Sequence, residues 1–141
     1  FMDRKEFILA TGKLAALTVA VSCFGCSSSS DSNNPTAPPS NVDFTIDLSS
    51  QEGQALESAG GSVYKNGIVI ARISQTEFTA LSQVCTHQGT TVQYQSGAAR
   101  FHCPNHGSNF DLNGGVINGP AASPLKKYTT TLNGNILRVT G

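Results

Sequence analysis

The sequence predicts an all-β domain of roughly eight to ten short strands, and three observations support this fold class. Residues 42–48 (VDFTIDL) alternate apolar and polar side chains, which is the period of a half-buried strand. Asn-Gly pairs at 66–67 and 133–134 stand between β-rich runs, as is typical of tight hairpin turns. Only residues 51–61 contain a helix-like stretch, and two glycines end it.

The remaining strands are predicted from short apolar runs bounded by turn residues. The segments of this kind are 62–73, 76–84, 91–94, 98–103 and 129–139. The first and last of them contain the Asn-Gly turns and therefore predict hairpins. We expect one folded domain over residues 42–141, without internal repeats.

Composition limits the partners that this domain can bind. The chain has nine basic and nine acidic residues, so a nucleic-acid partner is not expected. With 38% hydrophobic residues and no tryptophan, the core must be small. We therefore expect a further source of stability in addition to the burial of apolar side chains.

Residues 1–26 differ from the rest of the chain and indicate an export signal. A short charged start precedes a modestly apolar stretch. Arg4 and Lys5, followed by Phe7 and Ile8, are similar to the twin-arginine pattern with lysine in the second basic position. The sequence thus predicts a protein that functions on the extracytoplasmic or periplasmic side of a membrane.

A Ser- and Pro-rich segment, 27–41, follows the signal and predicts a flexible tether. Cys23 and Cys26 come just before it, and either could be the lipid-modified residue of a bacterial lipoprotein. A cleaved signal and an uncleaved anchor helix remain alternatives. If the protein is a lipoprotein or keeps an anchor helix, the folded domain stays attached to the membrane through its N-terminal segment.

Two short segments concentrate the residues that can bind a metal. CTHQG contributes Cys85 and His87, and CPNHGS contributes Cys103 and His106. Thiolate and neutral imidazole are ligands for a tetrahedral zinc ion and for an iron-sulfur cluster. Because strand-like segments separate the two loops, a hairpin could bring both loops to one tip.

The order of these residues resembles the Rieske 2Fe-2S family. The resemblance covers the CxH and CxxH patterns, the Gly-Ser that follows, Phe110-Asp111, and a Gly-Pro-Ala turn at 119–121. It implies a Rieske-type antiparallel β-sandwich or barrel with cluster-binding loops at one tip. It also implies one 2Fe-2S cluster as the cofactor.

The resemblance assigns a role to each candidate residue. Cys85 and Cys103 would bind a buried iron, and His87 and His106 would bind the iron nearer the surface. Ser108 matches the serine whose hydroxyl bonds a bridging sulfide. With only two thiolates the oxidised cluster is neutral, which favours a potential of about −150 to +300 mV over the roughly −400 mV of plant-type ferredoxins.

Two departures from the high-potential members of this family affect the expected chemistry. Phe110 stands where those members have a tyrosine that donates to a cysteine sulfur. Thr90 and Asn105 stand where quinol-oxidising members carry two more cysteines, joined in a disulfide. Both differences favour a moderate potential and argue against an orthodox quinol-oxidising subunit.

The expected function is one-electron transfer between redox proteins, such as a cytochrome or a membrane oxidoreductase, and not stand-alone catalysis. The iron-sulfur subunit of a quinol-oxidising or arsenite-oxidase-like complex is an alternative, and a zinc-stabilised binding module is another. An oxygenase needs a further iron site with two histidines. Only His102 remains for this, and its place beside Cys103 in a strand predicts that it points away from the site.

Overall fold

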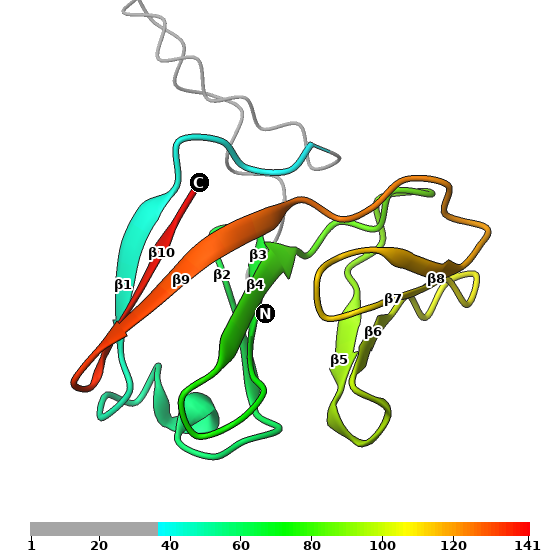
Figure 1. The fold of residues 1–141 in the computed structure, drawn as a ribbon. Coiled ribbons are helices and arrows are strands. Elements are labelled where there is room, and N and C mark those ends of the chain that lie inside the picture. The colour runs from blue at the N-terminus through cyan, green and yellow to red at the C-terminus, as the bar shows by residue number, and fades with distance from the viewer. Residues whose placement is uncertain (1–36) are drawn as a thin grey trace, which may run out of the picture. The chain divides into compact units, whose positions relative to one another are not determined.

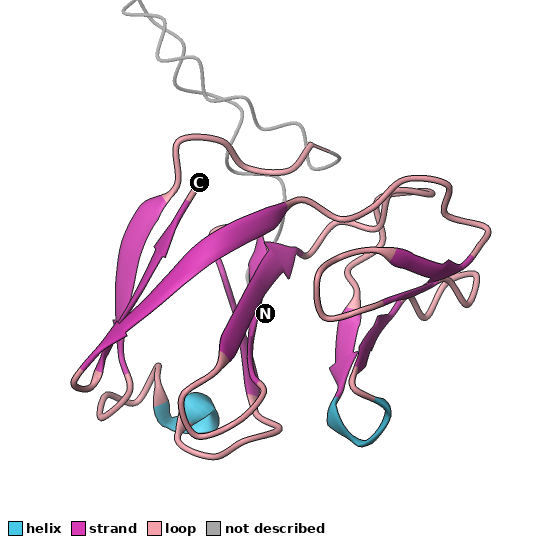
Figure 2. Cartoon of the chain, viewed as in Figure 1, coloured by secondary structure: helices cyan, strands magenta, loops and turns pink. Residues whose placement is uncertain are grey.

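The computed structural model describes residues 37–141, so the predicted export signal, Cys23, Cys26 and most of the predicted tether lie outside it. Residues 37–141 contain ten β-strands and two single-turn 3₁₀ helices (Figures 1 and 2). The predicted all-β class is therefore confirmed. The elements are β1 (Asp43–Asp47), η1 (Gln54–Leu56), β2 (Ser62–Lys65), β3 (Ile68–Arg72), β4 (Phe78–Ser82), β5 (Gln93–Gln95), η2 (Ser96–Ala98), β6 (Arg100–His102), β7 (Asn109–Phe110), β8 (Val116–Asn118), β9 (Lys127–Asn133) and β10 (Ile136–Thr140).

The larger sheet has six antiparallel strands in the order β1-β10-β9-β4-β3-β2. Its two edge strands are linked by Lys65 of β2. The Lys65 ammonium donates to the Thr45 carbonyl of β1 over 3.4 Å and lies 5.5 Å from the centroid of the Phe44 ring. The same ammonium pairs with Glu52 at 2.8 Å. The sheet thus curls until its first and last strands come close together.

The smaller sheet has four strands in the order β5-β6-β7-β8. Phe101 of β6 and Phe110 of β7 are fully buried, and they share a core with Val69 of β3 and Leu81 of β4. This shared core joins the two sheets. It also contains both cysteines of the predicted site.

The two hairpins predicted from Asn-Gly pairs are both present, but they differ in detail. Asn66 and Gly67 have φ of 51° and 77°, as a type I′ turn requires, between paired residues of β2 and β3. At the second hairpin, Asn133 pairs with Ile136, so the central residues are Gly134 and Asn135. Gly134 alone has positive φ there, at 58°, which indicates a type II′ turn.

The predicted helix-like stretch is one 3₁₀ turn, η1, which ends before the two glycines. The sequence did not predict β7 and β8, because one is two residues long and the other is wholly exposed. Among residues 37–141, no helix has the length and apolar character needed to cross a bilayer.

Candidate metal centre

Two loops at one end of the smaller sheet hold the candidate ligands. The first loop precedes β5, and two backbone hydrogen bonds close it. The Gly89 N–H donates to the Cys85 carbonyl over 2.8 Å, and the Cys85 N–H donates to the Thr90 carbonyl over 2.9 Å. Gly89 has φ of 77°, a conformation that glycine adopts without steric cost.

The second loop follows β6 and repeats this backbone arrangement. The Gly107 N–H donates to the Cys103 carbonyl over 3.0 Å, and the Cys103 N–H donates to the Ser108 carbonyl over 2.8 Å. Gly107 has φ of 80°. The two cysteines therefore occupy equivalent positions in two similar loops. If the two loops were aligned on their histidines, the cysteines would not coincide, because the histidine comes one residue later after the cysteine in the second loop.

The two kinds of candidate ligand have opposite environments. Cys85 and Cys103 are each 2% exposed and belong to the core between the sheets. His87 and His106 are exposed. Their rings meet edge to face, with centroids 4.8 Å apart and an interplanar angle of 84°. The structure thus pairs Cys85 with Cys103 in the core and His87 with His106 at the surface.

The thiol of Cys85 is held neutral in the absence of a metal. Burial is the main reason that its pKa is raised, and the neighbouring Cys103 sulfur raises the pKa further. The backbone N–H groups of His87 and Gln88 face the sulfur and oppose this shift. These N–H groups favour negative charge on the sulfur. The loop is therefore suited to a thiolate once a cation replaces the proton.

The candidate ligands are paired by kind, sulfur with sulfur and imidazole with imidazole. Within residues 37–141, no three side chains of His, Cys, Asp or Glu gather closely enough to surround a single ion. The four side chains form two pairs instead. Two thiols and two imidazoles, paired by kind, fit the two irons of a Rieske cluster, in which each iron takes two protein ligands and two sulfides.

Ser108 is buried between the second loop and a third one. Its side-chain oxygen accepts a hydrogen bond of 2.9 Å from the Ala121 N–H, in a segment that begins with the cis peptide Gly119-Pro120. The hydroxyl hydrogen is not used in this bond. The third loop also contacts the first one, because the Thr86 hydroxyl donates to the Ser123 carbonyl over 2.6 Å.

His102 takes no part in this arrangement. Its ring is half-buried and is 2.9 Å, Nδ1 to Oδ1, from Asn109. Sequence reasoning missed Asn109 and Asn118, whose side chains hydrogen-bond to each other and to the second loop. No motif points to these asparagines, although the strand alternation that predicted the direction of His102 could have suggested a polar partner for it.

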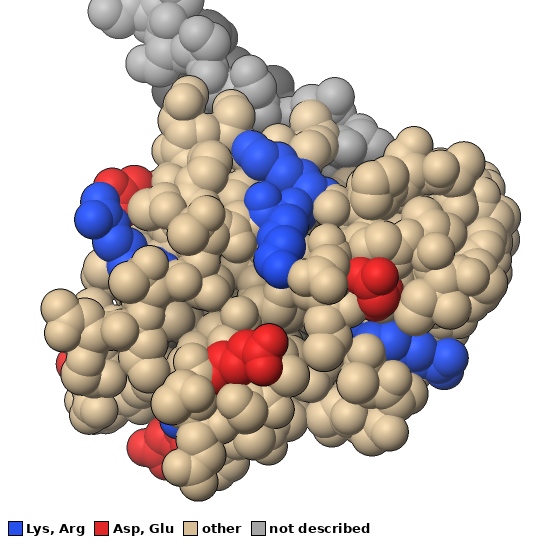
Figure 3. Space-filling view, viewed as in Figure 1, with Lys and Arg blue, Asp and Glu red and all other residues tan. Residues whose placement is uncertain are grey.

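The surface around the candidate ligands has few charges. Between Glu77 and Lys126, only Arg100 and Asp111 are charged. Figure 3 shows most charged side chains of this face away from the smaller sheet. The three loops at the candidate site, residues 85–90, 103–108 and 119–125, thus contribute no Lys, Arg, Asp or Glu side chain to this surface.

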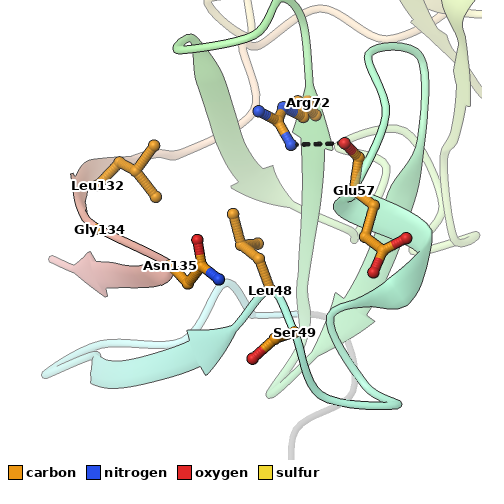
Figure 4. A pocket seen from close by; sticks show the side chains of 7 residues that line it. All are labelled: Leu48, Ser49, Glu57, Arg72, Leu132, Gly134 and Asn135. Carbon is orange, nitrogen blue, oxygen red and sulfur yellow. Dashed lines mark hydrogen bonds between the residues drawn. The ribbon is translucent and has the colours of Figure 1, made fainter.

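A separate cavity of about 350 Å³ lies at the larger sheet and is not part of this centre. Its wall includes Leu48, Glu57, Leu132 and Arg72. Figure 4 shows the Arg72 guanidinium directed at the Glu57 backbone, and the bond between them is 2.8 Å. Because backbone carbonyls occupy the donors of this guanidinium, we assign no ligand to the cavity.

Comparison with known proteins identifies the family of this domain. The family model of the Rieske [2Fe-2S] domain matches residues 43–129. The chain is 41% identical over 58 residues to the cytochrome b6-f complex iron-sulfur subunit of Prochlorococcus marinus (strain MIT 9301). It is 40% identical over 57 residues to the same subunit of Chlorobaculum thiosulfatiphilum. These matches cover 41% and 40% of this chain, but 33% and 32% of those proteins, so the chain spans about a third of the length of these curated relatives.

Solved structures share the fold at lower identity. The plasma membrane Rieske protein PetC3 of Synechocystis PCC 6803 aligns with a TM-score of 0.54 and 23% identity, over 68% of this chain and 99% of that one. The ferredoxin of carbazole 1,9a-dioxygenase from Nocardioides aromaticivorans IC177 aligns with a TM-score of 0.54 and 18% identity, over 72% and 98%. With the family established, the zinc-stabilised module is set aside. The chain belongs to the Rieske [2Fe-2S] family and carries a single Rieske-type 2Fe-2S cluster.

Proposed function

We propose that this protein transfers single electrons, with Cys85 and Cys103 as ligands of one iron and His87 and His106 as ligands of the other. The observation that carries this proposal is the separation of the four side chains into a buried sulfur pair and an exposed imidazole pair. When bound, the cluster supplies a site that accepts and releases one electron.

The site is open to a redox partner on its histidine side and covered on its cysteine side. The two cysteines are covered by the core, which keeps water away from their side of the site. The two histidines lie at the surface. An electron that leaves a metal bound by them would therefore reach a docked partner through the imidazole rings. Ser108 would donate its free hydroxyl hydrogen to a bridging sulfide and favour the reduced state.

We propose further that the protein works as a carrier or redox subunit held at the extracytoplasmic side of a membrane by residues 1–26. The signal-like pattern and the two cysteines Cys23 and Cys26 support this, and the Synechocystis relative is described as a plasma membrane protein. The donor and acceptor would be redox proteins such as a cytochrome.

The relatives favour a second candidate, the iron-sulfur subunit of a quinol-oxidising complex. The matched proteins are subunits of the cytochrome b6-f complex. Thr90, Asn105 and Phe110 favour the carrier instead, since they remove a disulfide and a hydrogen-bond donor from the site. A lower potential would leave quinol a poor electron donor.

Purification of the full chain from its native membrane, followed by a redox titration, tests the proposal. A carrier should show a reversible one-electron transition and no stoichiometric association with a cytochrome b. Stable co-purification with a cytochrome b, together with a potential above that of the quinol pool, would contradict the carrier and support the complex subunit. A protein without a redox-active cluster would contradict both.

A further inference from the structure

Two asparagines, Asn109 of β7 and Asn118 of β8, connect the second ligand loop to the third loop. The Asn109 amide donates to the Asn118 side-chain oxygen over 2.6 Å and to the Gly107 carbonyl over 3.1 Å. The Asn118 amide donates to the same Gly107 carbonyl over 2.9 Å and to the Gly119 carbonyl over 3.0 Å. Asn118 thus binds one backbone carbonyl from each loop.

The direction of each bond follows from the others. Both amide nitrogens face carbonyl oxygens, so both side-chain oxygens must act as acceptors. The Asn118 oxygen accepts from Asn109, and the Asn109 oxygen accepts from His102 Nδ1 over 2.9 Å. His102 therefore carries a hydrogen on Nδ1, and this requirement gives the third histidine a structural role.

These bonds hold the backbone close to both partners of the hydrogen bond between Ser108 and Ala121. Gly107 directly precedes Ser108, and Gly119 is two residues before Ala121, whose N–H donates to the Ser108 oxygen over 2.9 Å. This bond occupies one lone pair of the oxygen and so restricts the direction of the hydroxyl hydrogen. The two asparagines hold the backbone on both sides of that bond in place.

We propose that Asn118, supported by Asn109, is a positioning residue that orients the Ser108 hydroxyl toward the cluster. This orientation raises the midpoint potential of the cluster. The inference rests on the proposed function, because it assumes that the neighbouring loops hold the cluster. A fixed donor stabilises the reduced and more negative cluster better than one that rotates between several directions.

A double-mutant cycle of Asn118→Ala and Ser108→Ala tests this, with the midpoint potential as the readout. Asn118→Ala should lower the potential by part of the shift that Ser108→Ala causes. In the Ser108→Ala background the same change should cause no further shift. Asn133→Ala, which removes an exposed asparagine of β9, is the matched control and should leave the potential unchanged.

Hydrogen exchange, followed by mass spectrometry on the cluster-loaded protein, gives a second readout. The peptide that contains the Ala121 amide should exchange about tenfold faster in Asn118→Ala, as expected for the loss of about one hydrogen bond. Asn118→Gln keeps the amide donors and should restore part of both the exchange protection and the potential.

Three results would overturn the inference while leaving the proposed function intact. They are an unchanged potential in Asn118→Ala, an equal shift in the Ser108→Ala background, and loss of the cluster from Asn118→Ala, which would show that the residue retains the loop rather than orients the hydroxyl. Absence of iron and sulfide from the unmodified protein would instead overturn the proposed function and this inference together.

Discussion

The imidazole rings of His87 and His106 meet edge to face at the surface, with their centroids 4.8 Å apart, although they come from separate loops. If both rings bind one iron, removal of either leaves that iron with one protein ligand. We therefore expect His87→Ala and His106→Ala to lose most of their iron and the visible absorption of the cluster.

His102→Ala is the matched control, because His102 is a histidine next to Cys103 that faces Asn109 instead of the other imidazoles. Iron and sulfide analysis of the three variants should show a full cluster only in this one. If His102→Ala lost the cluster and His106→Ala kept it, the assignment of the ligands would be wrong.

Phe110→Tyr should raise the midpoint potential. Phe110 is fully buried in the core that contains both cysteines, and the family resemblance places a sulfur-directed tyrosine at this position. A new donor to a cluster sulfur stabilises the reduced state by about 1 kcal/mol, equivalent to roughly 40 mV for one electron. A redox titration measures the shift, and an unchanged or lower value would show that the hydroxyl does not reach the sulfur.

Arg72→Lys should lower the free energy of unfolding by about 2 kcal/mol, because a single ammonium cannot replace the planar guanidinium. The Arg72 guanidinium donates to the carbonyls of Leu56 and Glu57 at η1, each over 2.8 Å. It also donates to those of Ser74 and Gln75 in the turn after β3. Urea denaturation measures the loss.

Arg138→Lys is the control for this prediction. Arg138 forms a two-point ion pair with Asp43, and both side chains are more than half exposed. Exposed ion pairs contribute little to stability, so this variant should lose clearly less free energy of unfolding than Arg72→Lys does. Equal losses in the two variants would mean that the carbonyl contacts of Arg72 contribute no specific stability.

Ala99→Gly should stabilise the protein by about 1 kcal/mol. Ala99 ends η2 with φ of 46° and ψ of 50°, a left-handed conformation that is costly for a residue with a Cβ and free for glycine. Ala98→Gly changes the neighbouring residue, which has no positive φ, and should be destabilising by roughly 0.5–1 kcal/mol. Thermal unfolding of both variants checks the prediction, and loss of stability in both would contradict it.

The ionisation of Tyr128 should lower the free energy of unfolding at strongly alkaline pH. Burial raises the pKa of this phenol from 10.0 to about 12, so the unfolded chain ionises first as the pH rises. The resulting stabilisation is complete below pH 10 and is lost progressively toward pH 12, at up to about 1.4 kcal/mol per pH unit.

Tyr128→Phe removes this titration. It also removes the hydrogen bond of 2.8 Å from the hydroxyl to the Pro39 carbonyl, a loss that lowers stability at every pH. The difference in urea midpoint between the two proteins should therefore shrink between pH 9 and pH 11.5. A constant difference over this range would contradict the raised pKa.

The sequence predicted those parts of the fold that depend on local signals. Alternation identified the strand at 42–48, and Asn66-Gly67 identified a turn with two positive φ angles. Gly134 shifted the second turn by one residue, because glycine takes the first central position of a type II′ turn more readily than asparagine does. The strands β7 and β8 were missed because they depend on pairing with β6 and on the core, and not on their own residues.

For the candidate site, too, the sequence predicted what depends on local residues and missed what depends on the tertiary fold. The spacing of the four candidate ligands predicted that all four converge. The structure pairs the two cysteines and pairs the two histidines, and their joint binding of one cluster stays a prediction. The equivalent backbone frames of the two loops were not predictable, because they depend on hydrogen bonds between main-chain groups. The asparagine pair was not predictable either, since only the tertiary fold brings Asn118 to Gly107.

Pulsed electron paramagnetic resonance of the reduced protein, grown with ¹⁵N-histidine, tests the central claim most directly. The account predicts a spin-coupled 2Fe-2S signal with hyperfine coupling to nitrogens from two histidine rings, unchanged in His102→Ala. A signal without histidine coupling, or with coupling to His102, would contradict it.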